Sequence, residues 1–327
     1  MQAQPSPEAQ DLADLPALVA RMRTGERRAT SRVVTELERL SAAAPRLLEV
    51  LQPHLGHGLV IGFTGPPGAG KSTLINAYTG HLRAANKSVG IIAVDPSSPI
   101  SGGAILGDRI RMTATLDDDG VFMRSLASGR HLGGLCPAAV RVIDALDAAG
   151  KDVILLETVG TGQADIDVAE VADVRVVITA PGLGDDIQAM KSGLIEIADV
   201  LVVNKADREG ADRTLLHLKN ALSLKPDARA QVPVLKVTAL TGEGIPALAD
   251  AIDDIGARVT VGGPQARRRR RARYLIARAA ADLVAERVRM GQGGELDTLA
   301  DAVLAGRLLP AQAAAKLIGG KGGVNVP

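Results

Sequence analysis

The segment Gly65-Pro66-Pro67-Gly68-Ala69-Gly70-Lys71-Ser72 constrains this chain most, because it matches G-x-x-x-x-G-K-[ST] at every fixed position. An apolar run from Leu59 to Thr64 precedes it, and a helix-like run from Thr73 to Ala85 follows it. A strand, a glycine-rich loop and a helix in this order are the context of a phosphate-binding loop. Its glycines let N–H groups turn toward a phosphate, and the helix presents its positive N-terminal end. We therefore predict that residues 65–73 bind a nucleoside triphosphate.

Two residues of this loop have individual predicted roles. Lys71 would reach the β- and γ-phosphate oxygens, and the Ser72 hydroxyl would ligate Mg²⁺. The alternative is a glycine-rich turn that happens to precede a lysine. That alternative disagrees with both flanking segments, so we expect a functional loop.

From Gly58 to about Val261, strand-like and helix-like segments alternate. The segments between most strands are long enough for crossover helices, which a parallel sheet requires. The run Val200-Leu201-Val202-Val203 is apolar without alternation, as is typical of strands buried on both faces. The predicted fold class is α/β, with a mostly parallel sheet flanked by helices over residues 58–262. The predicted strands are Leu59–Phe63, Val89–Val94, Val121–Met123, Val153–Leu156, Val174–Ile178, Val200–Val203 and Val234–Val237.

Helical segments precede and follow this domain. Residues 1–57 carry apolar residues at helical spacing and predict an N-terminal helical extension. Residues 263–327 predict a C-terminal helical region that opens with the arginine run Arg267–Arg271. These arginines could grip phosphates or acidic partners. We favour a solvated, partner-facing helix surface, because no aromatic residues are interleaved for stacking on bases.

The composition limits the partners of the chain. Lys and Arg number 38 and Asp and Glu 37, a net charge of +1, so no global field favours nucleic acid or a membrane. Cys136 is the single cysteine, which excludes an internal disulfide framework and a multi-cysteine metal site. No apolar run approaches the roughly 18 residues of a membrane span, and the polar start, Met1 to Asp14, lacks a secretory pattern. We expect a cytoplasmic protein.

The segment Asn204-Lys205-Ala206-Asp207 matches N-K-x-D and directly follows a strand of the buried type. The Asp207 carboxylate could accept the N1–H and a 2-amino hydrogen of guanine, and adenine offers neither donor there. Thr238-Ala239-Leu240 follows the next strand, where GTPases place a loop whose N–H contacts guanine O6. Together with the phosphate loop, these residues predict a P-loop GTPase that binds GTP and GDP.

Glu157-Thr158-Val159-Gly160 ends a further strand, at the place of the D-x-x-G element and with Glu in the Asp position. A carboxylate there would hold Mg²⁺ through water, and the Gly160 N–H could sense the γ-phosphate. The alternative is a plain exit from the strand. Thr161 follows the glycine, so the water-positioning Gln of Ras-like proteins is absent, and we expect slow intrinsic hydrolysis unless a partner completes the site.

Two further loops combine glycine with charged residues. Asp95 ends the second strand beside the predicted phosphate site, and Asp108 could approach Mg²⁺ or the attacking water or could cap a helix. In the loop that starts at Pro181, Lys191 could be a surface lysine or a residue that swings toward the nucleotide. The five histidines lack the spacing of a metal site, so we regard them as ordinary.

Three long patterns, D-P-S-S-P-x-S-G-G-x-I-L-G-D-R-x-R-M, E-T-V-G-x-G-Q and P-G-x-G-D-D-I-Q-x-M-K-x-G-x-x-E-I-A-D, occur with the phosphate loop and N-K-A-D. With them the chain closely resembles the MeaB/MMAA/ArgK family, G-protein chaperones of cobalamin-dependent methylmalonyl-CoA mutase within a wider metallochaperone group. The resemblance implies a GTPase that binds the mutase, gates delivery of adenosylcobalamin and protects the mutase from inactivation. It also implies a homodimer held by C-terminal helices, which would make residues 263–327 a dimerisation arm.

By the same resemblance, Asp95, Asp108 and Glu157 match acids around Mg²⁺, and Lys191 matches a lysine on a mobile loop near the nucleotide. The sequence holds no cobalamin-binding D-x-H-x-x-G, so we expect no direct cobalamin binding by this chain. Two alternatives remain open. A nickel-insertion GTPase of the wider group would usually carry Cys/His clusters, and an ArgK-type phosphotransferase would need an acceptor pocket and a base.

Overall fold

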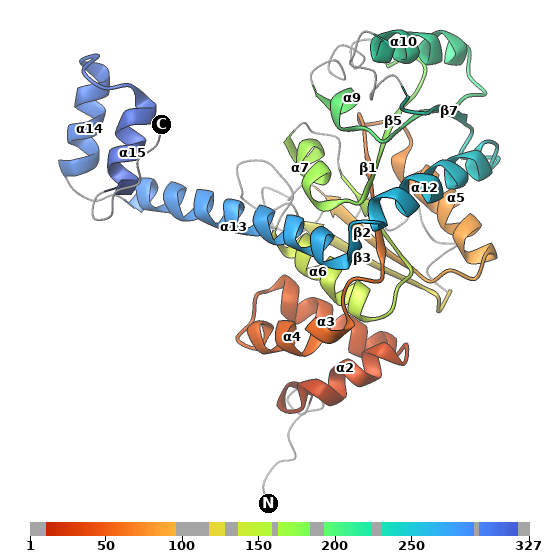
Figure 1. The fold of residues 1–327 in the computed structure, drawn as a ribbon, viewed down its shortest axis with the longest axis horizontal. Helices are drawn as coiled ribbons and strands as arrows, with labels where there is room; N and C mark the ends of the chain where they lie inside the picture. Colours follow the sequence, from red (N-terminus) through yellow and green to blue (C-terminus); the bar gives the residue numbers. More distant parts are fainter. Residues whose placement is uncertain are drawn as a thin grey trace, which may run out of the picture. The chain divides into compact units, whose positions relative to one another are not determined.

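Seven parallel strands form one sheet in the described part of the chain, in the order β3-β2-β4-β1-β5-β6-β7. Figure 1 shows helices around this sheet. The computed structural model describes residues 11–95, 118–127, 137–158, 163–183, 193–223, 231–290 and 294–319. The predicted parallel sheet and its seven strands are confirmed. The strands are β1 Leu59–Thr64, β2 Val89–Asp95, β3 Val121–Ala127, β4 Val153–Glu157, β5 Val174–Thr179, β6 Val200–Asn204 and β7 Val234–Val237.

Helices cover both faces of the sheet, which explains why its strands are apolar without alternation. One face packs against the pair α5 and α12, and the other against the set α6, α7, α9 and α10. Since all strands run the same way, their carboxyl ends meet at one edge, where the loops that carry the predicted site begin. The helices are α5 Lys71–Ala84, α6 Pro137–Ala148, α7 Gln163–Val171, α9 Leu194–Ile197, α10 Ala211–Ser223 and α12 Ile245–Thr260.

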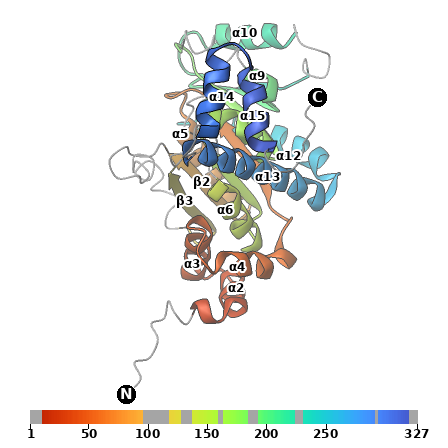
Figure 2. The same cartoon turned by 90° about the vertical axis from the view of Figure 1, so that its left-hand side faces the viewer.

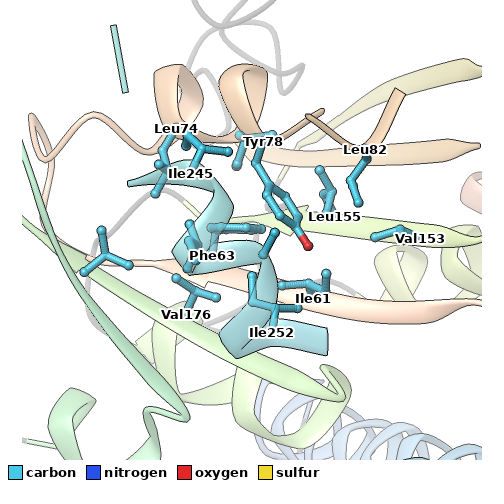
Figure 3. Close-up of a cluster of buried hydrophobic side chains, with 14 of the residues drawn as sticks. Ile61, Phe63, Leu74, Tyr78, Leu82, Val153, Leu155, Val176, Ile245 and Ile252 are labelled. Atoms are coloured by element: carbon cyan, nitrogen blue, oxygen red, sulfur yellow. The ribbon is translucent and has the colours of Figure 1, made fainter. Parts of the chain in front are cut away.

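The core between the sheet and the helices α5 and α12 consists mostly of aliphatic side chains (Figure 3). Phe63 and Tyr78 are its aromatic pair, with ring centroids 6.0 Å apart and planes tilted by 54°. Tyr78 is only 1% exposed, and burial raises the pKa of its hydroxyl. Ile, Leu and Val therefore fill most of this core, in place of aromatic residues.

The N-terminal helices form a small layer that packs on the sheet domain through α3 and α6 (Figure 2). Asp14 caps the first of them, because its Oδ1 accepts a hydrogen bond from Ala17 N at 3.1 Å. Helical residues ahead of the first strand are therefore present as predicted. These elements are α2 Leu15–Arg23, α3 Arg27–Glu38, α4 Ala44–Leu51 and the 3-10 turn η1 Gln52–His54.

In the described residues after position 262, the helices are α13 Gly263–Met290, α14 Gly294–Leu304 and α15 Pro310–Gly319. The chain divides into two compact units after Ala272, so the first turns of α13 belong with the sheet and its remainder with α14 and α15. The domain limits 57/58 and 262/263 remain predictions. Among the described residues, no helix is long and apolar enough to cross a membrane.

The arginine run at the start of α13 is not the solvated surface that we predicted. Arg267 and Arg271 are only 6% and 4% exposed, and both bind the buried carboxylate of Asp173. Arg270 is half-buried and binds the same carboxylate. The prediction was wrong for these three arginines because their anion lies more than 90 residues earlier in the chain.

Candidate nucleotide-binding site

The phosphate loop connects β1 to α5 at the carboxyl edge of the sheet. Its backbone is left-handed at three glycines, with φ of 143° at Gly65, 79° at Gly68 and 87° at Gly70. A Cβ at Gly65 would lie 2.0 Å from the carbonyl oxygen of Ile178 in β5, so a larger residue does not fit there. All three glycines are thus needed for the backbone geometry, and Gly65 is also needed for close packing.

The helix α5 begins at Lys71, directly after the loop. The first-turn N–H groups of this helix have no partner within the helix, and they give its start a partial positive charge. Lys71 is 8% exposed, and its Nζ donates to the carbonyls of Gly65 at 2.9 Å and Pro66 at 3.2 Å. The ammonium group therefore lies over the loop that the sequence predicts to hold phosphates.

Ser72 and Glu157, two of the residues predicted to hold Mg²⁺, meet at this edge. The Ser72 hydroxyl donates to Glu157 Oε1 at 2.6 Å, and Glu157 is 4% exposed. The pairing of Phe63 with Glu157 in the β1–β4 register places this carboxylate beside the end of β1. A hydroxyl and a carboxylate are oxygen ligands of the kind that Mg²⁺ prefers, so these residues fit the ion.

The structure describes only some of the acidic residues that are predicted to lie around Mg²⁺. Asp95 ends β2, two residues after Ala93, which pairs with Glu157 of β4. The backbone of Asp95 therefore ends at the same edge, and its side chain is outside the description. Asp108, Gly160 and Lys191 also lie outside the described residues.

Asn204 connects the phosphate loop to the segment that follows β7. Its side chain is 1% exposed, and its Nδ2 donates to the carbonyl of Ala69 at 2.9 Å and of Gly70 at 3.3 Å. Its Oδ1 accepts from Ala239 N at 3.2 Å. One amide thus ties together two predicted parts of the site that are more than 160 residues apart in sequence.

The remaining residues of the predicted base site follow β6 and β7, two adjacent strands. Lys205 has a left-handed backbone with φ of 56°, and its Nζ donates to the carbonyl of Gly68 at 2.7 Å. Asp207 is exposed. Thr238 and Ala239 are buried, and Leu240 is 86% exposed.

The sequence analysis missed contacts that position these elements. Thr158 and Thr64 join the ends of β4 and β1 through their hydroxyls, whose oxygens are 3.0 Å apart. Gly62 allows α7 to pack on β1, because a Cβ there would lie 2.1 Å from Val168 Cγ1. The available sequence signals are a threonine at or just after the end of an apolar strand and a glycine within one, and neither signal identifies the partner.

A parallel sheet with a phosphate loop after its central strand, and with N-K-x-D at the end of β6, defines a P-loop GTP-binding protein. In this class the fold supplies the phosphate cradle, and the strand ends supply base recognition. In the described geometry, Asn204 joins the phosphate loop to the segment that follows β7.

Comparisons with known proteins agree with this class. The family model described as Methylmalonyl Co-A mutase-associated GTPase MeaB matches residues 27–292. A Pyrococcus abyssi protein named as a GTPase is 47% identical over 241 residues, 72% of this chain and 74% of that protein. GTPase ArgK of Escherichia coli is 37% identical over 260 residues, 77% of this chain and 78% of that protein.

A crystal structure described as LAO/AO transport system kinase is also similar, with a TM-score of 0.75 and 28% identity. The similarity covers 94% of this chain and 97% of that one, so it extends well beyond the sheet domain. This chain belongs to the MeaB family of methylmalonyl-CoA mutase-associated GTPases. It is therefore a GTPase of the MeaB/ArgK type.

Proposed function

We propose that this GTPase is a chaperone of adenosylcobalamin-dependent methylmalonyl-CoA mutase or of a related cobalamin-dependent mutase. In this role, GTP hydrolysis gates loading of the cofactor and protects the mutase from inactivation. The observation that carries the proposal is the match of residues 27–292 to a family described by its association with that mutase. The cobalamin would sit on the partner, because this sequence has no D-x-H-x-x-G motif.

For the reaction, we propose in-line attack of water on the γ-phosphate, with the developing charge neutralised by Lys71 and the N–H groups of the loop. Ser72 and Glu157 would hold Mg²⁺, and their contact at 2.6 Å supports this assignment. When bound, Mg²⁺ neutralises charge on the β- and γ-phosphate oxygens. Asp95 and Asp108 are proposed as further acids near the ion. Gly160 and Lys191 are proposed to contact the nucleotide.

For base recognition, we propose that Asp207 accepts hydrogen bonds from guanine and that the N–H groups of 238–240 face its O6. The exposure of Asp207 next to the buried Asn204 supports this placement, since the carboxylate is free to meet a ligand while its neighbour holds the loop. ATP would leave the Asp207 carboxylate without a donor, which disfavours binding of adenine.

We also propose that the chain is a homodimer held by its C-terminal helices. The unit that starts at Arg273 contains an open apolar cavity of about 450 Å³. Leu304 and Leu309 of this unit are 86% and 66% exposed, and a second copy of the chain could cover them. The cavity is lined by Val288, Leu296, Leu299, Ala300, Val303, Leu304, Pro310, Ala313, Ala314 and Leu317.

The test is GTP hydrolysis by the purified protein, alone and with a purified cobalamin-dependent mutase, with ATP as the control nucleotide. We expect slow GTP turnover that rises strongly with the mutase and no comparable use of ATP. Lys71→Ala should lose productive GTP binding, and it controls for a contaminating GTPase. Turnover that does not respond to the mutase would contradict the chaperone role and would favour the metal-insertion alternative. ATP-dependent transfer to an acceptor would favour the phosphotransferase.

A further inference from the structure

The buried carboxylate of Asp173 joins three elements that are far apart in the sequence. Asp173 is 2% exposed and lies in the short connection between α7, which ends at Val171, and β5, which begins at Val174. Its Oδ2 accepts hydrogen bonds from Val60 N of β1 at 3.0 Å, from Arg267 Nη1 at 3.1 Å and from Arg271 Nη2 at 2.8 Å. One anion therefore holds β1, the end of α7 and the first turns of α13 together.

Two arginines of α13 also bind the carboxyl end of α7 directly. Arg270 donates to the carbonyls of Glu170 at 3.2 Å and Ala172 at 2.7 Å. Arg271 Nε donates to the carbonyl of Val171 at 2.9 Å. The last carbonyls of a helix have no partner within it and carry its negative end, so guanidinium groups there stabilise its termination.

The first turns of α13 are themselves anchored to the segment before β1. Arg267 donates to the carbonyls of Gly56 at 2.8 Å and Gly58 at 3.2 Å. The N–H groups of the same two glycines donate to the buried Asp147 of α6, at 2.6 Å and 2.8 Å. A Cβ at Gly56 would lie 2.5 Å from Pro264 Cβ, so the start of α13 packs closely here.

The amino end of α7 follows, in the chain, the strand end that carries Glu157 of the candidate nucleotide site. The chain runs from Glu157, which accepts the hydrogen bond of Ser72, through residues 159–162 and into α7 at Gln163. The helix packs on β1 at Gly62, where Val168 fills the space that a side chain would occupy. The amino end of α7 thus follows the strand that carries Glu157, and its carboxyl end is bound by Arg270 and Arg271 of α13.

We propose that Arg270 and Arg271 are positioning residues for α7, so that the nucleotide state of the site and the conformation of the first turns of α13 are coupled. Figure 1 labels β1, α7 and α13, the elements that Asp173 and these arginines connect. Such coupling is reciprocal. A contact that fixes the first turns of α13 would therefore also change how α7 divides between its GDP-bound and GTP-bound positions. The inference needs the GTPase activity of the family and does not depend on the proposed mutase partner.

The test compares Arg270→Ala with Arg269→Ala in the full-length protein. Arg270 is a better target than Arg267 or Arg271. Its side chain is 36% exposed, so removing it leaves no enclosed cavity, whereas the other two side chains are buried. Arg269 lies one residue away, is exposed and carries the same charge, so its variant is a matched control. Thermal unfolding of both variants shows whether they fold.

The first readout is hydrogen–deuterium exchange with GDP and with a non-hydrolysable GTP analogue. We expect wild-type protein and R269A to show nucleotide-dependent exchange in residues 163–171 and 263–272. R270A should keep the difference in 163–171 and lose it in 263–272. Loss of coupling should also change kcat by about 2- to 30-fold, the range of typical coupling energies, with KM for GTP changed less than about twofold.

Arg270→Lys separates directed hydrogen bonding from charge. A lysine keeps the positive charge and lacks the planar fork that binds two carbonyls and a carboxylate together, so we expect partial coupling. The proposal is overturned if wild-type exchange in 263–272 does not depend on the nucleotide. It is also overturned if R270A matches R269A in exchange and kcat, or if R270K behaves as wild type.

Discussion

Replacing Asn204 by Ala should separate the phosphate loop from the base-binding strand ends. The change removes two hydrogen bonds to the carbonyls of Ala69 and Gly70 and one from Ala239 N. Each net hydrogen bond contributes about 0.5–1.5 kcal/mol, and a buried group left without a partner costs about 1–3 kcal/mol. Asn204 is 1% exposed, so water does not easily replace the lost amide.

The bond to Gly70 at 3.3 Å is long and counts little, so we expect the free energy of unfolding to fall by about 2–4 kcal/mol. Urea denaturation without nucleotide measures this loss. Calorimetric titration with GDP should show affinity reduced roughly tenfold or more, since about 1.4 kcal/mol corresponds to a factor of ten. Asn220→Ala on the exposed face of α10 is the matched control. A stability loss below about 0.5 kcal/mol, with unchanged GDP affinity, would refute the reasoning.

Three further changes test other parts of the structure. Asp207→Asn should relax the preference for GTP over ATP in competition binding, and unchanged selectivity would contradict its role in base recognition. Gly62→Val should lower the melting temperature, because its Cβ would lie 2.1 Å from Val168 Cγ1 and overpacking costs about 1–3 kcal/mol; an unchanged melting temperature would show that α7 relaxes freely. Burial raises the pKa of Asp144 to about 6, against the opposing charges of Arg271 and Arg141. Its protonation therefore stabilises the fold below pH 4, and this contribution is lost as the pH rises through 6. Asp144→Asn should thus gain stability over wild type between pH 4 and 7, by on the order of 1 kcal/mol because the residue is partly exposed. A pH-independent difference in urea denaturation would contradict this assignment.

Much of the sheet domain could be predicted because its signals are local. The apolar runs specify strands buried on both faces, and the phosphate-loop pattern specifies a left-handed backbone at its glycines. The parallel arrangement follows from the crossover helices between the strands. The roles of Asp95, Asp108, Gly160 and Lys191 stay predictions, since the side chain of Asp95 and the whole of the other three residues lie outside the description.

The contacts that connect the parts of the site depend on the tertiary structure. The sequence alone determined that a hydroxyl, a carboxylate and an amide are available at Ser72, Glu157 and Asn204. Only the folded sheet brings Ser72 to Glu157, and Asn204 to the phosphate loop, because parallel strands bring their ends to one edge whatever their distance in sequence.

The burial of the arginine run, at the amino ends of the strands, could not be predicted from the sequence either. Its charge and helical spacing are visible in the sequence and are equally compatible with a solvated surface. Its burial depends on Asp173, a single acid that precedes β5. A guanidinium is buried only where a partner offsets its loss of hydration, and the identity of that partner is decided by the packing of α7, β1 and α13.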